Sequence, residues 1–411
     1  MSLFQPLSLN CGCVLTNRLA KAAMEENMAD PNNAPSDALF RLYRAWGEGG
    51  IGLIITGNVM VDYRGMTSPG GVVLEDDSEL DKFKYWAQQA KCQGAKVWMQ
   101  INHPGRQMPA NLGQMALAPS VVPLNLGNLS KNFAPQRAMS EADIHDMIHR
   151  FATTASLAEQ AGFDGVEIHA AHGYLISQFL SPLSNRREDA WGGSLENRAR
   201  LLISVVRAIN AKVSPSFAIA VKLNSADFQR GGFTQEDACQ VIELLNNERV
   251  DLVELSGGSY EAPAMQGDVR DGSTLAREAY FLSFAETIAS KATMPLMVTG
   301  GIRRREVAQH VVESGIAMVG IASALAITPD LPKRWLNNDN VAPRFPTFQW
   351  QNKTLTALAN MAIVKFQLRR LGKGLASRPH VAPWWAFLVQ QLILLRRAKR
   401  YRQWAEQRAK A

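Results

Sequence analysis

The chain has 411 residues, of which 46% are hydrophobic and 20% are charged. These values allow one large barrel with an appendage, or two domains, and they exclude a disordered protein. Residues 341–411 hold 14 of the 44 Lys and Arg but one of the 37 Asp and Glu, so this tail carries about +13 and residues 1–340 about −6. The basic balance therefore belongs to the tail, and we expect no nucleic-acid partner.

Along residues 1–340, short apolar runs alternate with amphipathic segments of helical length. The segment from Leu3 to Leu15 predicts a small hairpin that closes the bottom of a barrel. Strands are predicted at Leu19–Ala23, Gly52–Thr56, Lys96–Ile101, Gly165–Ile168, Ala218–Leu223, Leu252–Ser256, Leu296–Thr299 and Ala317–Ile321. Helices are predicted at Asp77–Gln93, Glu141–Gln160, Leu195–Ala211 and Glu278–Ser290, and a capping box at Thr234-x-x-Asp237 opens another. Eight strand–helix alternations favour an α/β fold of the (β/α)8 TIM-barrel type, with an open doubly wound sheet as the alternative.

The chain changes character after Pro332. Asn337 to Pro346 is a polar linker that contains proline, and two amphipathic helices are predicted to follow. We therefore divide the chain into a barrel domain, 1–336, and a basic helical tail, 337–411. The apolar run Trp384 to Leu395 is too short to span a bilayer. Two roles stay open for the tail: packing on the acidic body or on a second subunit, which we favour, or peripheral contact with an anionic membrane.

The four cysteines, Cys11, Cys13, Cys92 and Cys239, are too few and too scattered for a disulfide framework or a four-thiolate cluster. The first 19 residues lack the basic start and apolar run of a secretory signal. We expect a reducing, cytoplasmic location and no metal centre.

Three chemically active side chains follow the strand predicted at Gly165–Ile168. His169, His172 and Tyr174 lie within six residues of one another, where a barrel of this type builds its active site. Two imidazoles can hold a carbonyl oxygen, and a phenol can give up a proton. An i, i+3 helical pair or a metal site is the alternative, but no third metal ligand is suggested nearby.

The stretch VEIHAAHGYLISQFLSPLSNRREDAWGGSLENRARLL, residues 166–202, resembles the signature of the old yellow enzyme family of flavin-dependent ene-reductases. The resemblance covers about residues 3–335. It implies a non-covalent FMN across the barrel mouth, NAD(P)H as electron donor and a small enone-type substrate. His169 and His172 match the pair that hydrogen-bonds the substrate carbonyl, and Tyr174 matches the proton donor.

The same resemblance implies flavin-binding positions at other strand ends. Gln100, in KVWMQINHPGRQ, matches the amide at the flavin pyrimidine edge, and Lys222 matches the cation beside flavin N1 and O2. Asn58 matches a further flavin-lining position. Backbone contacts to the flavin are expected from Ala22, Ala23 and Met24, and phosphate contacts from Gly300, Gly301, Ala322 and Ser323.

Two positions depart from the family pattern. Glu25 stands where relatives usually have Thr or Cys, and a carboxylate cannot donate a hydrogen bond to flavin O4 unless it is protonated. Glu25 is therefore protonated, or turned away, or the flavin is more reducing than usual. Relatives commonly have Gly-Arg where Ala322 and Ser323 stand, which leaves the Ser323 hydroxyl and N–H, or Arg303, to meet the phosphate.

These observations predict an FMN-dependent oxidoreductase that uses NAD(P)H to reduce the activated C=C bond of α,β-unsaturated carbonyl compounds in a ping-pong mechanism. A flavin oxidase, or a dehydrogenase of amines or other donors, is an alternative on the same scaffold. A barrel aldolase or isomerase with Lys222 as a Schiff base, and a docking module dominated by the tail, are alternatives of other classes. The natural substrate, the choice of NADH or NADPH, and a homo-oligomer stay open.

Overall fold

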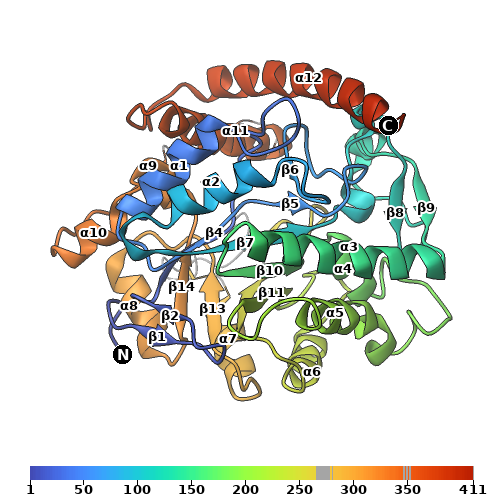
Figure 1. Ribbon diagram of the computed structural model, residues 1–411, viewed down its shortest axis with the longest axis horizontal. Coiled ribbons are helices and arrows are strands. Elements are labelled where there is room, and N and C mark those ends of the chain that lie inside the picture. The colour runs from blue at the N-terminus through green and yellow to red at the C-terminus, as the bar shows by residue number, and fades with distance from the viewer. Residues whose placement is uncertain (265–277, 280, 346–347, 349, 351–352, 411) are drawn as a thin grey trace.

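The computed structural model describes residues 1–264, 278–279, 281–345, 348, 350 and 353–410. Its centre is a closed barrel of eight parallel strands, because β10 pairs with both β7 and β11 (Figure 1). In barrel order the strands are β3 (Leu19–Lys21), β4 (Leu53–Ile55), β7 (Lys96–Asn102), β10 (Gly165–Ala170), β11 (Ala218–Asn224), β12 (Leu252–Ser256), β13 (Leu296–Thr299) and β14 (Met318–Ile321). All eight predicted strands are confirmed to within two residues at each end, and the open doubly wound sheet is excluded.

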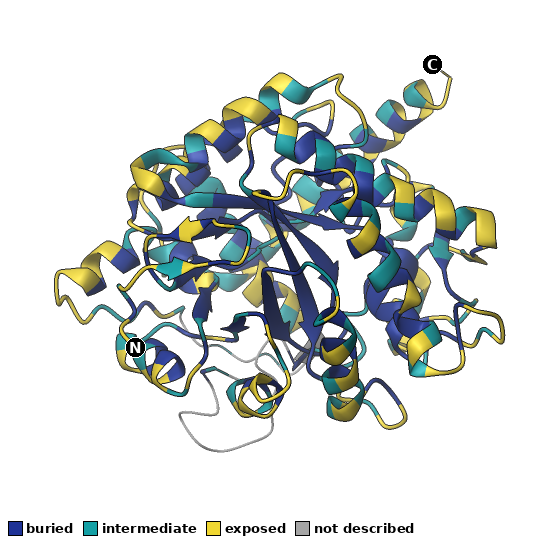
Figure 2. Ribbon diagram, turned by 60° about the horizontal axis from the view of Figure 1, so that its bottom comes forward, coloured by how far each residue is buried: buried dark blue, intermediate teal, exposed yellow. Residues whose placement is uncertain are grey.

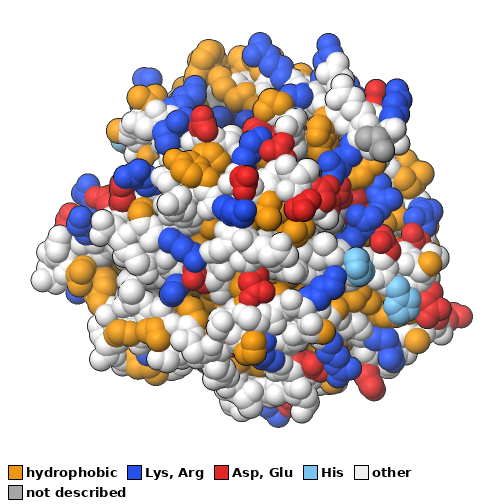
Figure 3. All heavy atoms as spheres, in the orientation of Figure 1, with side chains coloured by type: hydrophobic (Ala, Val, Ile, Leu, Met, Phe, Trp, Pro, Cys, Tyr) orange, Lys and Arg blue, Asp and Glu red, His pale blue; other side chains and the backbone are white. Residues whose placement is uncertain are grey.

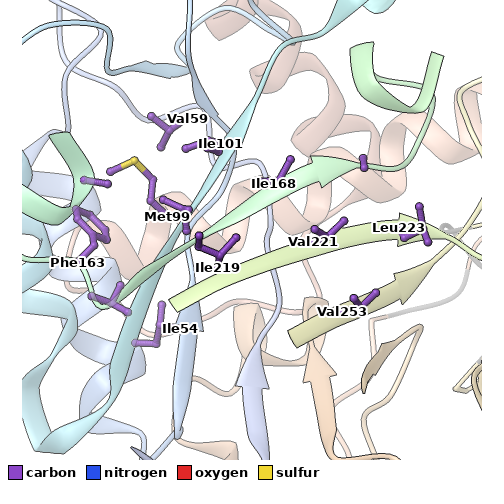
Figure 4. Close-up of a cluster of buried hydrophobic side chains, with 14 of the residues drawn as sticks. Ile54, Val59, Met99, Ile101, Phe163, Ile168, Ile219, Val221, Leu223 and Val253 are labelled. Atoms are coloured by element: carbon purple, nitrogen blue, oxygen red, sulfur yellow. The ribbon is translucent and has the colours of Figure 1, made fainter. Parts of the chain in front are cut away.

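The barrel strands are buried on both faces (Figure 2), which explains why they read as continuous apolar runs rather than as an alternating pattern. Outward-facing side chains such as Met99, Ile168 and Val221 form one continuous core with the surrounding helices (Figure 4). These helices are α1 (Asp37–Glu48), α2 (Leu80–Ala90), α3 (Glu141–Gln160), α4 (Leu175–Leu180), α5 (Leu195–Asn210), α6 (Gln235–Leu245), α7 (Leu282–Ala289), α8 (Arg305–Glu313), α9 (Ser323–Ile327) and α10 (Leu331–Leu336). Short strands in the loops are β5 (Val59–Met60), β6 (Val72–Val73), β8 (Ala116–Ala118) and β9 (Gln136–Ala138).

Local capping decides where several helices begin. The capping box of Thr234 and Asp237 is formed at the start of α6, as predicted. Helix α2 begins three residues later than expected, because Asp76 accepts a hydrogen bond from the Ser78 N–H and holds the chain in a turn. Helix α7 begins four residues later, and Glu278 is instead a buried ion-pair partner of arginines after β13. Residue 280 of that predicted helix, and Pro346 of the predicted linker, lie outside the described residues.

The amino-terminal hairpin closes the bottom of the barrel, as predicted. Strands β1 (Leu7–Ser8) and β2 (Val14–Leu15) pair antiparallel. Leu9 and Leu15 pack against the buried Trp98 and the small inward-facing residues of the strands. This end of the barrel is therefore dry and apolar, and the polar inward-facing side chains gather toward the carboxyl ends of the strands.

The tail forms the two predicted helices, α11 (Lys353–Gly372) and α12 (Pro383–Arg408). Helix α11 packs against α1 and α9, and α12 runs antiparallel beside it across the upper side of the molecule (Figure 1). The far end of α12 is tied to the body: the Tyr401 hydroxyl donates to the Tyr63 carbonyl at 2.7 Å, and Arg408 pairs with Glu75 at 2.8 Å. Packing of the tail on the acidic body is thus confirmed, while the division of the chain at residue 337 stays a prediction.

A search of the described part of the chain finds no helix with both the length and the apolar composition needed to cross a bilayer.

Candidate active site

A layer of buried polar side chains crosses the inside of the barrel above its apolar bottom. Lys222 on β11 pairs with Glu254 on β12 at 2.7 Å, and Thr299 on β13 donates to the same carboxylate at 2.6 Å. Gln100 on β7 donates to Glu167 on β10 at 2.5 Å. All five point inward because strand residues alternate between the two faces of the barrel wall.

The charges in this layer compensate one another. Burial raises the pKa of Glu167 well above its usual value, and neighbouring Glu254 adds to the rise, which favours the neutral form of Glu167. Burial alone would lower the pKa of Lys222, but Glu254 and Glu167 raise it instead. Lys222 is therefore an ammonium, held as the cation that the sequence predicted at this strand end. Glu167 and Glu254 belong to the same polar layer and were missed by sequence reasoning, although their inward strand positions were a usable signal.

The two predicted histidines lie together beyond this layer. His169 is the fifth residue of β10, and the centroid of its ring is 5.1 Å from that of His172. His172 has a φ of +59°, and its backbone N–H donates to Asn224 at 3.0 Å, which stabilises this left-handed conformation. The His172 Nε2 is 2.7 Å from the Ser256 hydroxyl.

Both imidazoles are neutral at physiological pH. Burial lowers the pKa of His169 well below 6.5, and His172 and the Lys222 ammonium lower it further. Burial and Lys222 do the same to the pKa of His172. The His169 Nδ1 accepts a hydrogen bond from the Ala171 N–H at 3.2 Å, so its proton sits on Nε2. His169 is thus a neutral N–H donor that adds no positive charge to the site.

The predicted proton donor lies beside this pair. The Tyr174 ring is 4.8 Å from the His169 ring, edge to face, and its hydroxyl oxygen is 3.1 Å from that of Tyr260. Burial raises the pKa of Tyr174 well above 10, neighbouring Tyr260 and Glu25 add to the rise, and a hydrogen bond from Asn58 partly offsets it. Tyr174 is therefore a neutral phenol within reach of Asn58. Tyr260 was missed, since the SGGSY stretch after β12 carries no motif that we used.

Residues 22–25 follow β3 at the mouth of the barrel. Ala22 is fully buried and its N–H donates to Ile321 at 2.9 Å, while Ala23 and Met24 are half-buried. Glu25 accepts a hydrogen bond from Thr67 and forms an ion pair of 3.1 Å with Lys365 of α11. Burial alone would raise the pKa of Glu25, but the Lys365 ammonium and the Thr67 hydroxyl outweigh burial and lower it. The structure therefore opposes the protonated alternative for Glu25, and the other two alternatives stay open.

The predicted phosphate positions lie at the ends of the last two barrel strands. Gly300 and Gly301 follow β13, and Gly301 has a φ of +68°, a conformation that favours glycine. Ala322 and Ser323 follow β14. Arg303, the suggested substitute for the missing arginine, pairs with buried Glu278 at 3.2 Å.

The structure thus brings the predicted residues to one end of one barrel. Two neutral imidazoles and two neutral phenols lie next to one another at this end. Such groups can donate hydrogen bonds to a carbonyl oxygen and a proton to a carbon. Lys365 was also missed, and no sequence signal could have found it, because it lies 340 residues from its partner.

The chain is similar in sequence to known flavin oxidoreductases. The chain is 38% identical over 360 residues to the NADH-dependent flavin oxidoreductase iliE of Hypocrea jecorina, covering 82% of this chain and 89% of the relative. It is 34% identical over 327 residues to an NADH oxidase of Thermoanaerobacter brockii, covering 78% of this chain and 48% of that longer protein.

Solved structures show the same fold. An old yellow enzyme homologue from Zymomonas mobilis superposes with a TM-score of 0.71 at 24% identity, covering 86% of this chain and 98% of that one. A 2-naphthoyl-CoA reductase in complex with 2-naphthoyl-CoA superposes with a TM-score of 0.74 at 27% identity, covering 82% of this chain and 52% of that one.

A family model described as the NADH:flavin oxidoreductase / NADH oxidase family matches residues 2–340, which is the barrel and its hairpin. The chain therefore belongs to this family of oxidoreductases, and membership implies FMN and NAD(P)H as its cofactors.

Proposed function

We propose that the protein is an FMN-dependent ene-reductase, which uses NAD(P)H to reduce the activated C=C bond of α,β-unsaturated carbonyl compounds in a ping-pong mechanism. The observation that carries the proposal is the grouping of His169, His172 and Tyr174 at the carboxyl end of β10: all three are neutral, and the His169 ring contacts the rings of both others. An enone needs hydrogen-bond donors at its oxygen and an acid at its α-carbon.

The residues present fit FMN. The side-chain amide oxygen of Asn58 is buried and has no hydrogen-bond partner among the described residues, so it is an acceptor available to a ligand. Lys222 supplies the buried ammonium that a flavin pyrimidine ring prefers beside N1 and O2, and Gln100 lies on β7, which is separated from the strand of Lys222 by β10 alone. Gly300 and Gly301 offer backbone N–H groups to the phosphate. When bound, FMN would take a hydride from NAD(P)H and pass a hydride to the β-carbon of the substrate.

The chain's own residues have three tasks in this reaction. His169 Nε2–H, with His172 beside it, donates to the substrate oxygen and stabilises the enolate-like charge that develops there. Because both rings are neutral, the substrate oxygen receives hydrogen bonds rather than a proton. The Tyr174 phenol then gives its proton to the α-carbon. Before this transfer, the hydrogen bond to the Tyr260 hydroxyl keeps the Tyr174 hydroxyl in position.

Phenol binding tests the proposal. A phenol should bind to the holoenzyme as a phenolate between the two histidines and give a long-wavelength charge-transfer band. The double variant His169→Ala/His172→Ala should lose this band while retaining FMN. A double variant that keeps the band would remove the histidines from the substrate site. An anaerobic titration with 2-cyclohexenone and NAD(P)H measures turnover directly, and turnover with amine donors or O2 alone would favour the dehydrogenase or oxidase instead.

The Schiff-base alternative is disfavoured by the state of Lys222. A lysine must lose its proton to attack a carbonyl group. Glu254, 2.7 Å away, raises the Lys222 pKa and keeps the ammonium charged.

We also propose that α12 contacts an anionic lipid surface. Large apolar side chains line its outer face at helical spacing, with exposed fractions of 60% for Trp384, 46% for Leu388, 48% for Leu392 and 64% for Leu395. Exposed Lys399 continues the same face one turn later, and Figure 3 shows basic and hydrophobic side chains intermingled along the upper edge of the molecule. Apolar and basic groups on one helix face match the chemistry of an anionic bilayer surface.

We also propose a cytoplasmic location for the enzyme, where its four free cysteines stay reduced.

Co-sedimentation with vesicles of phosphatidylcholine, with and without phosphatidylserine, tests the lipid contact of α12. Leu388→Asp/Leu392→Asp should abolish binding to the anionic vesicles, and Val121→Asp, an exposed apolar residue elsewhere, should not. If the wild type ignores vesicles and its solution mass is halved by the double substitution, this face is instead an interface between two copies.

A further inference from the structure

A buried lysine of α11, Lys365, lies beside the residues that follow β3 at the mouth of the barrel. The Lys365 ammonium lies 3.1 Å from Glu25 Oε2 and also contacts the Asn27 side-chain oxygen. Lys365 is buried and the Glu25 side chain is 21% exposed, so the pair is partly removed from water. Such a pair differs from a screened surface ion pair, because removing one partner leaves the other charge uncompensated in a low-dielectric environment.

The carboxylate of Glu25 acts on the active site. Glu25 comes four residues after the end of β3, at the same barrel mouth as Tyr174. Its charge is one of the causes that raise the pKa of Tyr174, and it also raises the pKa of Tyr260. Its second oxygen accepts a hydrogen bond from Thr67, so the carboxylate is held on both sides. An ionised group whose field reaches both phenols would also reach a cofactor bound next to them.

We propose that Lys365 is a positioning residue of the active site, which cancels the charge of Glu25 beside the bound flavin. Through Lys365, the tail is part of the redox centre. This inference rests on the proposed function, because it requires FMN at the barrel mouth. Lys365 acts through Glu25 and touches neither substrate nor flavin in this proposal.

The sign of the effect follows from the charge of the cofactor. Reduced FMN is more negative than oxidised FMN, so an uncompensated carboxylate weakens binding of the reduced form more than that of the oxidised form. An uncompensated ammonium does the opposite. A charge within about 4–6 Å of another group typically changes an equilibrium by one to three powers of ten.

The experiment measures the dissociation constants of oxidised and reduced FMN for full-length protein, the latter under anaerobic conditions, and takes the ratio of reduced to oxidised. Lys365→Met should raise this ratio about tenfold or more. Glu25→Gln should lower it by a similar factor. The double variant Lys365→Met/Glu25→Gln should return to within about threefold of the wild type, because both charges are gone. Lys373→Met, which removes an exposed lysine just after α11, should leave the ratio unchanged.

Opposite signs for the two single variants separate an electrostatic role from a structural one, since loosened packing would weaken binding of both redox forms alike. Equal ratios in the wild type, Lys365→Met and Glu25→Gln would overturn the inference while leaving the proposed function intact. A wild type that binds no FMN would instead overturn the proposed function. If Lys365→Met does not fold, the near-isosteric Glu25→Gln decides alone: a lowered ratio supports the inference, and an unchanged ratio overturns it.

Discussion

At the residue scale, the two phenols of the site have unequal tasks in the proposed reaction, although their hydroxyl oxygens lie 3.1 Å apart. The Tyr174 ring contacts the His169 ring edge to face, whereas the Tyr260 ring contacts the Tyr174 ring. Burial raises the pKa of each, so either could serve as a neutral acid. Position relative to the histidines, rather than acidity, therefore distinguishes Tyr174, the proposed proton donor, from Tyr260.

We expect Tyr174→Phe to slow reduction of 2-cyclohexenone by about 10²–10⁴-fold, the usual contribution of general acid catalysis. Reduction of the flavin by NAD(P)H does not need this proton and should change little. Stopped-flow measurement of each half-reaction checks the prediction, with Tyr260→Phe expected to have the smaller effect. Equal slowing of both half-reactions in Tyr174→Phe would assign the residue a structural role.

At the element scale, α11 is joined to the barrel by close backbone contact as well as by Lys365. Its last residue, Gly372, accepts a hydrogen bond from Arg41 of α1 at 2.7 Å. A Cβ at this position would lie 2.8 Å from the Ala38 carbonyl oxygen and 3.0 Å from the Met28 side chain. Glycine is thus required where α11 meets α1, for reasons of space.

Gly372→Ala should destabilise the protein by about 1–3 kcal/mol, the usual cost of overpacking a tight contact. The thermal midpoint measured at a fixed FMN concentration should fall accordingly. Ala376→Ser, an exposed position just after the helix, should leave it unchanged. A midpoint for Gly372→Ala equal to that of the wild type would show that α11 can move away from α1 without cost.

At the scale of the whole molecule, the buried histidines make stability depend on pH. Burial lowers the pKa of His103 to about 4, whereas an unfolded histidine titrates near 6.5. Between these two values the unfolded chain takes up a proton that the folded protein does not. The contribution of neutral, buried His103 to the free energy of unfolding is therefore fully present above pH 6.5 and is lost as the pH falls toward 4.

We expect the wild type to lose about 2 kcal/mol more stability than His103→Gln when the pH falls from 7 to 5. Thermal unfolding of both proteins at the two pH values, with FMN held constant, measures the difference. Parallel losses in the two proteins would mean that His103 is protonated in the folded state, contrary to its burial.

Much of this molecule could be predicted from local sequence. The barrel strands appear because each is a short apolar run between turn residues, and the capping box of α6 is formed by neighbours three residues apart. His169, His172 and Tyr174 could be recognised for the same reason, since six consecutive residues at one strand end hold all three. Signals of this kind depend only on residues that are close along the chain.

What only the tertiary structure decided is which distant groups meet. Glu167 and Glu254 share the barrel interior with Lys222 because three strands close side by side, and Tyr260 reaches Tyr174 from another strand end. The charge state of Glu25 depends on Lys365, 340 residues away. Burial and neighbouring charges set the protonation of such groups, and both arise only when the chain has folded, so the sequence alone could name these residues but could not determine their charge.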